Sequence, residues 1–154
     1  MKTRTKTDIH IIGSTEKVSF PTLGAKGVMA KVDTGADVSA IWCSQVTRYE
    51  DRIECVFFAP ASPFYTGQRF VFKKGDYKVS RVYNSFGHHQ RRYKVKLPVV
   101  IAGRRILASF TLSDRSGKAY PVLLGRKLLA RKFLVDVTVT SVKIIRRMKR
   151  ITKV

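Results

Sequence analysis

The most constraining stretch of the sequence joins two apolar alternating segments through an acidic turn. Val28, Ala30 and Val32 alternate with their neighbours at the period of a β-strand, and a second alternation runs from 36 to 41. Residues 33–35, Asp-Thr-Gly, lie between them. A carboxylate between two apolar strands is costly to bury unless something uses or compensates it, and a glycine permits a tight turn. The stretch therefore predicts a reactive carboxylate or, more simply, a strand-turn-strand with an acidic turn residue.

The chain is long enough for one domain with a substantial core. It has 154 residues, of which 44% are hydrophobic. We assign residues 9–140 to this domain, between a basic N-terminal arm at 1–8 and a basic C-terminal tail at 141–154. The formal net charge of +21 favours polyanionic partners such as nucleic acid, an acidic peptide or an anionic membrane.

Several classes of protein find no support in the sequence. No run is apolar and long enough to span a bilayer, and the basic N-terminus lacks the apolar segment of a signal peptide, so we expect a cytoplasmic protein without membrane association. Cys43 and Cys55 suggest no disulfide framework, and with His10, His88 and His89 they do not have the spacing of a closed metal site. A phosphate-binding glycine loop is absent. We therefore expect no metal and no cofactor.

Short strands dominate the remaining pattern and predict an all-β barrel or sandwich. Residues 44–52 are polar and predict a connection, and Lys73–Asp76 predicts the turn of a hairpin between 70–72 and 77–79. Between 121 and 133 the leucines and Phe133 have helical spacing, which predicts one short helix, with a return to strand at 134–139. The tail at 143–154 fits a strand, a helix or a loose arm. The other predicted strands lie at 9–12, 17–20, 53–58, 81–83, 91–97, 99–101 and 106–112.

Three stretches occur in the order found in retropepsin-like aspartic proteases: Val32–Ala36, a glycine-containing hairpin at about Tyr77–Val95, and Val122–Leu129. The chain resembles more closely the bacterial and archaeal family labelled ATP-dependent zinc protease, now viewed as retropepsin-like. That resemblance covers about residues 9–137 and rests on Ile11–Gly13, Ala30–Ala36, Ser39–Ala40, Arg91–Tyr93, Leu123–Arg126 and Phe133–Asp136. It implies an all-β, closed retropepsin-like barrel with a flap hairpin and one short C-terminal helix.

The sequence departs from that family at two positions. Asp37 stands where the family often has a basic residue, and Trp42 stands near the place of a histidine. Asp37 makes the loop more similar to the retroviral version, and we interpret it as a structural acid or the partner of a nearby cation. The motifs of a zinc peptidase and of an ATP-binding loop are both missing from the sequence.

The resemblance implies a homodimer, because a single-domain chain supplies one Asp-Thr-Gly loop and the catalytic site needs two. Two Asp33 carboxylates would share a proton and activate water for peptide hydrolysis. Thr34 would bridge the two loops, Gly35 would let them approach, and Ala36 would form part of the cleft floor. These roles make Asp33, Thr34 and Gly35 the candidate catalytic residues.

The hairpin is expected to close over the substrate. Its tip offers Asn84, Gly87, His88 and His89, and the alternative is an exposed polar turn. Adjacent residues on a strand point to opposite faces, so at most one of Arg91 and Arg92 should face the cleft. The resemblance implies that Arg126 braces the Asp loops through an ion pair between subunits, whereas a solvated arginine at a helix start is the alternative.

The most specific expectation is therefore a dimeric, flap-gated aspartic endopeptidase with a cationic cleft that acts on acidic, glutamate-rich peptides. Relatives of the resembled family occur beside ligases that add glutamates to a ribosomal protein, which suggests a polyglutamate tail. The alternative is a basic β-barrel that binds RNA or the ribosome without catalysis. Basic arms at both ends favour this alternative, and the lack of a clustered aromatic platform disfavours it.

Overall fold

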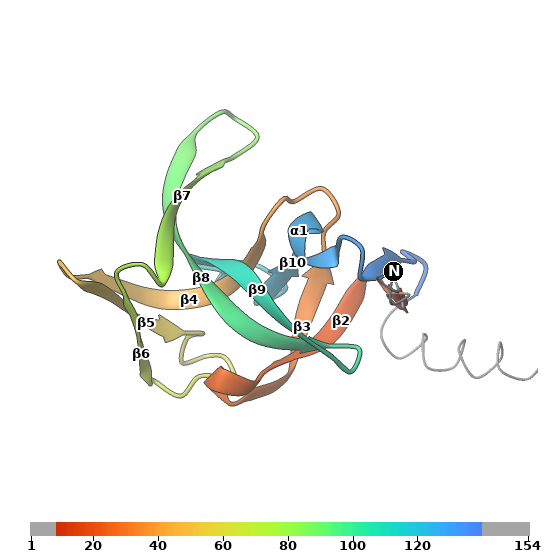
Figure 1. Ribbon diagram of the computed structural model, residues 1–154, viewed down its shortest axis with the longest axis horizontal. Coiled ribbons are helices and arrows are strands. Elements are labelled where there is room, and N and C mark those ends of the chain that lie inside the picture. Colours follow the sequence, from red (N-terminus) through yellow and green to blue (C-terminus); the bar gives the residue numbers. More distant parts are fainter. Residues whose placement is uncertain (1–8, 140–154) are drawn as a thin grey trace, which may run out of the picture.

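The computed structural model describes residues 9–139, and within them a closed barrel of six strands dominates (Figure 1). A 3₁₀ turn, η1 (Pro21–Leu23), and a four-residue helix, α1 (Arg126–Leu129), interrupt the strands. The strands are β1 (His10–Ile12), β2 (Thr15–Phe20), β3 (Ala25–Val32), β4 (Ser39–Arg48), β5 (Arg52–Phe57), β6 (Arg69–Lys73), β7 (Tyr77–Tyr83), β8 (His89–Ile101), β9 (Arg104–Ser113), β10 (Val122–Leu124) and β11 (Phe133–Val135).

The short strand β10 closes the barrel. The ring runs β10-β3-β2-β8-β9-β4, and β10 pairs in parallel with β3 on one side and antiparallel with β4 on the other. β10 therefore holds together the two strands that lead into and out of the Asp-Thr-Gly turn. The predicted all-β closed barrel with one short helix is confirmed for the part of the chain that the structure describes.

Alternate side chains of the long strands fill the barrel. On β8 the residues Val95, Leu97, Val99 and Ile101 are buried, while the positions between them are exposed or half-buried. The ring of Phe110 on β9 packs edge-on against that of Phe20, with 5.4 Å between the ring centroids. This period of two keeps one face of the sheet apolar and leaves the other face to polar and charged side chains.

Two sequence predictions at the edge of the barrel are wrong. The predicted connection at 44–52 is largely strand, because β4 continues to Arg48 and pairs with β5. The turn at Lys73–Asp76 exists, but its flanking strands do not form a hairpin: β6 pairs with β5, and β7 pairs with β8. Ring packing accounts for this choice, since Phe70 packs on Phe57 and Tyr77 on Tyr93, with centroids 5.4 and 5.8 Å apart.

The predicted helix between 121 and 133 is much shorter than its leucine spacing suggests. Leu124 belongs to β10 and Phe133 to β11, so only Arg126–Leu129 is helical. At the start of the predicted helix, the pairing of β10 with β3 and β4 outweighs helical propensity. After α1, the positive φ of Arg131 prevents the helix from continuing. The predicted strand at 134–139 is the shorter β11, which pairs in parallel with β1. The predictions for residues 1–8 and 143–154 lie outside the described residues.

Among residues 9–139, the structure contains no helix with the length and apolar character that crossing a membrane requires.

Candidate active site

The Asp loop, residues 33–38, is held in place by backbone hydrogen bonds at its start. The Asp33 amide donates to the carbonyl of Leu124 at the end of β10 (2.9 Å), and the Ala36 amide donates back to the Asp33 carbonyl (3.3 Å). The Gly35 amide donates to Oδ1 of Asp33 at 2.9 Å, which fixes the carboxylate within its own turn. The Asp33 side chain remains half-buried, and Thr34 and Gly35 are exposed. The carboxylate is therefore positioned and still accessible.

The second half of the Asp loop lies against the start of α1. The Arg126 amide donates to the Ala36 carbonyl (2.7 Å), and the Lys127 amide donates to the Asp37 carbonyl (3.1 Å). At the base of this contact, the Gly125 amide donates to Oγ of buried Ser39 at 2.9 Å. The predicted site did not include Ser39, because its role depends on the approach of Gly125, which follows it by 86 residues in the sequence.

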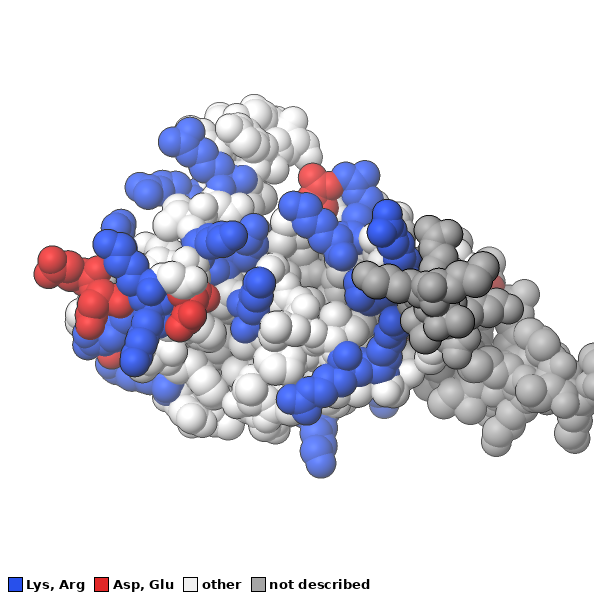
Figure 2. Space-filling view, in the orientation of Figure 1, with Lys and Arg blue, Asp and Glu red and all other residues white. Residues whose placement is uncertain are grey.

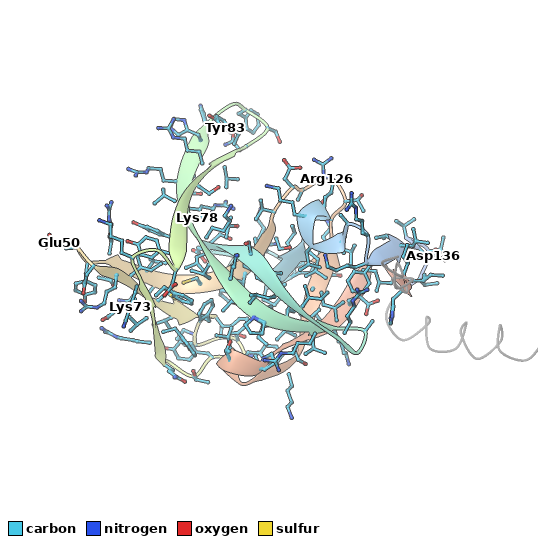
Figure 3. The ribbon with its side chains drawn as sticks, viewed as in Figure 1. Glu50, Lys73, Lys78, Tyr83, Arg126 and Asp136 are labelled. Carbon is cyan, nitrogen blue, oxygen red and sulfur yellow. The ribbon has the colours of Figure 1, made fainter. Side chains whose placement is uncertain are left out.

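Arg126, the first residue of α1 (Figure 3), pairs with Asp37 of its own chain through one guanidinium nitrogen and Oδ1. This contact confirms Asp37 as the partner of a nearby cation. The hydrogen bond and the charge of Arg126 hold the pKa of the Asp37 carboxyl below its ordinary value. Arg126 thus braces the Asp loop within one chain, and the expected ion pair between subunits stays a prediction.

The predicted hairpin forms with the predicted bounds. β7 and β8 pair antiparallel from Tyr77 opposite Val95 to Tyr83 opposite His89. The hairpin projects from the barrel on the same side as the Asp loop (Figure 1). This arrangement places the hairpin residues of the sequence prediction on the side of the barrel that carries Asp33.

Asn84 and Gly87 shape the tip of the hairpin. Oδ1 of Asn84 accepts hydrogen bonds from the amides of Phe86 and His88, each at 3.0 Å, and Gly87 has a φ of 79°. These features define a tight polar turn in which Gly87 adopts the left-handed conformation that glycine tolerates best. The Phe86 ring is 86% exposed, an unusual position for a large apolar side chain in an isolated chain.

The remaining hairpin candidates occupy different positions. His88 is exposed at the tip, whereas His89 begins β8 and its ring lies 5.9 Å from that of Tyr83. Arg91 and Arg92 are successive β8 residues, so their side chains leave opposite faces of the hairpin. Burial, and then the charge of Arg92, lower the pKa of Arg115.

No group of three His, Cys, Asp or Glu side chains between residues 9 and 139 is arranged to hold a metal ion. Cys43 and Cys55 are free thiols, and both are buried.

A closed six-strand barrel with Asp-Thr-Gly on a turn braced by a Gly-Arg segment defines a retropepsin-like protein. A family model described as the retropepsin-like aspartic endopeptidase RimB matches residues 11–146, and the chain belongs to this RimB-like family. The family assignment confirms the resemblance inferred from the sequence.

The chain is also similar to parts of longer proteins. It is 29% identical over 128 residues to a probable alpha-L-glutamate ligase of Shewanella pealeana, and 30% identical over 129 residues to one of Desulfotalea psychrophila. Each match covers 82% of this chain and 28% of the relative, so the chain spans little more than a quarter of these proteins. The solved structure of a Legionella pneumophila protein of unknown function has the same fold. Its TM-score is 0.66 at 22% identity, and the match covers 87% of this chain and 98% of that one.

Proposed function

We propose that this protein is a homodimeric aspartic endopeptidase whose two Asp33 carboxylates activate water. The observation that carries the proposal is the fixed, accessible position of Asp33, on a loop held by β10 on one side and by the start of α1 on the other. The family supports a hydrolase of this kind. Thr34 and Gly35 are exposed in the single chain, as expected of residues that a second copy covers.

The chemistry requires one carboxylate in each protonation state. The ionised Asp33 accepts a proton from water as the water oxygen forms a bond to the scissile carbonyl carbon. The protonated Asp33 of the second subunit donates its proton to the carbonyl oxygen, which gives a neutral tetrahedral diol. Collapse of the diol breaks the carbon–nitrogen bond, and a carboxyl group returns a proton to the leaving amine. Ala36 would form part of the cleft floor.

We further propose that the substrate is an acidic, glutamate-rich peptide. Lysine and arginine side chains cover much of the face seen in Figure 2, and the acidic side chains gather mainly at one end of it. Such a field raises the local concentration of an anionic substrate near the Asp loop. The names of the longer relatives, which refer to glutamate ligation, are consistent with a glutamate-containing substrate.

The test compares wild type with Asp33→Asn on glutamate-rich peptides, with product detection by mass spectrometry. Asp33→Asn keeps the shape of the side chain and removes the acid–base pair, so hydrolysis should vanish while the melting temperature changes little. Asp51→Asn is the matched control, because Asp51 is an exposed acid in the turn between β4 and β5. Hydrolysis that persists in purified Asp33→Asn would refute the aspartic mechanism.

A second candidate function, RNA or ribosome binding without catalysis, rests on the net charge of +21. It predicts tight, salt-dependent binding of RNA by wild type and by Asp33→Asn, and no cleavage of any peptide. The same protein preparations decide between the two candidates, since only the peptidase loses its activity with Asp33.

A further inference from the structure

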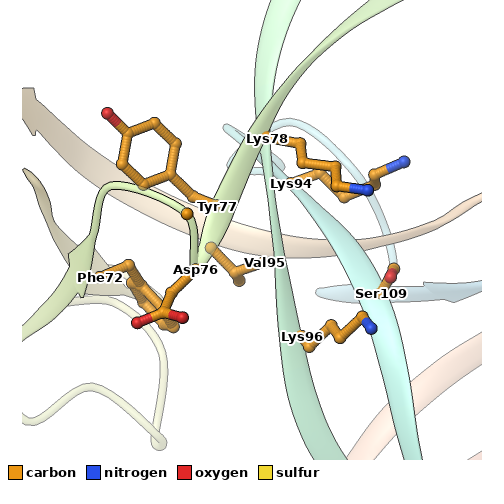
Figure 4. A pocket seen from close by; sticks show the side chains of 9 residues that line it. Phe72, Asp76, Tyr77, Lys78, Lys94, Val95, Lys96 and Ser109 are labelled. Carbon is orange, nitrogen blue, oxygen red and sulfur yellow. The ribbon is translucent and has the colours of Figure 1, made fainter.

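Five lysines line two adjoining hollows on the outer face of the barrel. One hollow, of about 500 Å³, lies between the root of the hairpin and β9 and is lined by Lys78, Lys94 and Lys96 (Figure 4). The other, of about 330 Å³, lies between β9 and α1 and is lined by Lys94, Lys127 and Lys132. Lys94 and Ser109 belong to both hollows, so together they form one surface, which we call the lysine groove.

The lysine groove leads to the Asp loop. Val38, the last residue of that loop, and Ser39 line its second hollow. Its floor there is apolar and comes from Ile106, Ala108 and Leu128. A chain that leaves the space above Asp33 along this path would therefore pass from the catalytic loop onto a surface with lysine side chains on both sides.

The arrangement of these lysines works against the stability of the fold. Lys78 and Lys94 are direct partners in the β7–β8 register, and like charges opposite one another on a sheet repel. None of the five lysines forms an ion pair with another residue between 9 and 139. Asp76 also lines the first hollow and is the one acidic side chain among the residues that line either hollow. Lys127 lies near enough to Asp37 for its charge to help lower the pKa of that carboxyl. Five lysines against one lining acid leave the two hollows with an excess of positive charge, which favours an anionic ligand.

The spacing of the lysines fits an extended peptide. Lys94 and Lys96 point to the same face of β8, about 6.8 Å apart along the strand. Alternate side chains of an extended peptide repeat at the same distance, so two glutamates at i and i+2 could each meet one lysine. Lys127 and Lys132 would meet carboxylates closer to the Asp loop.

We propose that the lysine groove is an exosite that binds a run of carboxylates in the substrate chain, beyond the residues next to the scissile bond. This inference rests on the proposed function for the identity of its ligand, a segment of acidic peptide. The groove would hold the acidic segment while the bond to be cleaved lies at Asp33. Substrates with several carboxylates on that side would bind more tightly than substrates with one.

The experiment measures binding rather than cleavage, in the Asp33→Asn protein, by fluorescence anisotropy of a labelled octaglutamate. Adding Lys78→Gln and Lys94→Gln should weaken binding about tenfold, as expected for the loss of two partly exposed charge pairs. The matched control is Lys17→Gln with Lys26→Gln, which removes the same charge from exposed positions on β2 and β3. The control pair should change affinity less than twofold. A neutral glycine–serine peptide of equal length should bind weakly to all three proteins.

Three outcomes would overturn the exosite: unchanged affinity in the groove variant, an equal loss in the control variant, or tighter binding of an octauridylate RNA that the groove substitutions abolish. The groove variant should melt at the same or a higher temperature than its parent, because a repulsive pair has been removed. Failure of the proposed function has a different signature, since a wild type that cleaves no peptide could still show groove-dependent binding of octaglutamate.

Discussion

Gly125 lies against the backbone of Val38 more closely than any other amino acid could. A Cβ atom placed on Gly125 would come within 2.7 Å of the Val38 carbonyl carbon and 2.9 Å of the Ala36 carbonyl oxygen. The φ of Gly125 is −95°, which any residue adopts, so close approach and not conformation requires glycine here. The Asp loop is therefore supported by a direct backbone contact with the start of α1.

Gly125→Ala should accordingly destabilise the protein and displace the Asp loop. Overpacking against a backbone that cannot yield costs about 1–3 kcal/mol, and activity should fall further because Asp33 loses its position. Chemical denaturation and kcat/KM measure the two effects. Gly117→Ala is the matched control, since nothing lies within 4 Å of its added Cβ. A Gly125→Ala protein as active and stable as the control would show that the contact is dispensable.

Glu16 gives the fold a pH dependence that does not involve the Asp loop. Its side chain is buried and Oε1 accepts a hydrogen bond from the Gly13 amide (3.0 Å). Burial raises the pKa of Glu16 above its ordinary value of 4.5, so its contribution to stability is full below pH 4.5 and is lost as pH rises through the raised pKa.

Replacing Glu16 with Gln removes the buried charge and keeps an acceptor for Gly13. The stability of Glu16→Gln relative to wild type should therefore improve as pH rises above 4.5 and level off once the pH exceeds the raised pKa of Glu16. Melting temperatures at a series of pH values test this, with Glu50→Gln as the control at an exposed position. A constant difference across the series would mean that Glu16 titrates at its ordinary pKa.

The Asp37–Arg126 pair should matter more for catalysis than for folding. Both side chains are well exposed, and the amides of Arg126 and Lys127 hold the Asp loop independently of the pair. Asp37→Asn should lower kcat/KM severalfold with little change in melting temperature. The lowered pKa means that the pair is intact above pH 3.8 and is lost only as pH falls through the folded-state pKa.

A double-mutant cycle of Asp37→Asn with Arg126→Gln checks this prediction through activity at neutral pH. If the two residues act as a pair, the double variant should be no less active than either single variant. Additive losses would assign the two side chains separate roles.

The hairpin tip should affect turnover without affecting the barrel. Asn84→Ala removes the acceptor for two tip amides, which loosens the turn, and a loose lid positions substrate poorly. We expect a severalfold loss in kcat/KM at an unchanged melting temperature. Ser85→Ala, at the neighbouring tip position, is the control. Equal activity of the two variants would show that the conformation of the tip is irrelevant to catalysis.

Much of the fold could be predicted because the strands alternate clearly. The turn at residues 33–35 and the hairpin from Tyr77 to Val95 were both predictable, since local pattern and glycine placement specify them. Partner choice was not predictable in the same way. Nothing local indicates that β6 turns away from β7, because that choice depends on ring packing with strands distant in sequence.

In the candidate site too, features specified by the local sequence were predictable, and features that depend on contacts between distant segments were not. The neighbours of Asp33 left a reactive carboxylate and an acidic turn residue both open, and the resemblance of two further segments favoured the first. The contacts of Ser39 and Gly125 could not be predicted, because they depend on how β10 closes the barrel. The short β10 also explains the overestimated helix. Leucines at helical spacing cannot reveal that Leu124 is committed to a strand by pairing with Val32.

The backbone hydrogen bonds that join the Asp loop to Leu124, Arg126 and Lys127 do not involve the Asp33 side chain, so a chain that lacks the acid should still assemble with one that has it. Under the dimer proposed above, such mixed pairs hold a single carboxyl group and are inert. Activity in a mixture of wild type and Asp33→Asn would then follow the square of the wild-type fraction, about one quarter at equal amounts. A defective copy would therefore inactivate the functional copy with which it pairs, so the Asp33→Asn variant should act as a dominant-negative inhibitor of the wild type.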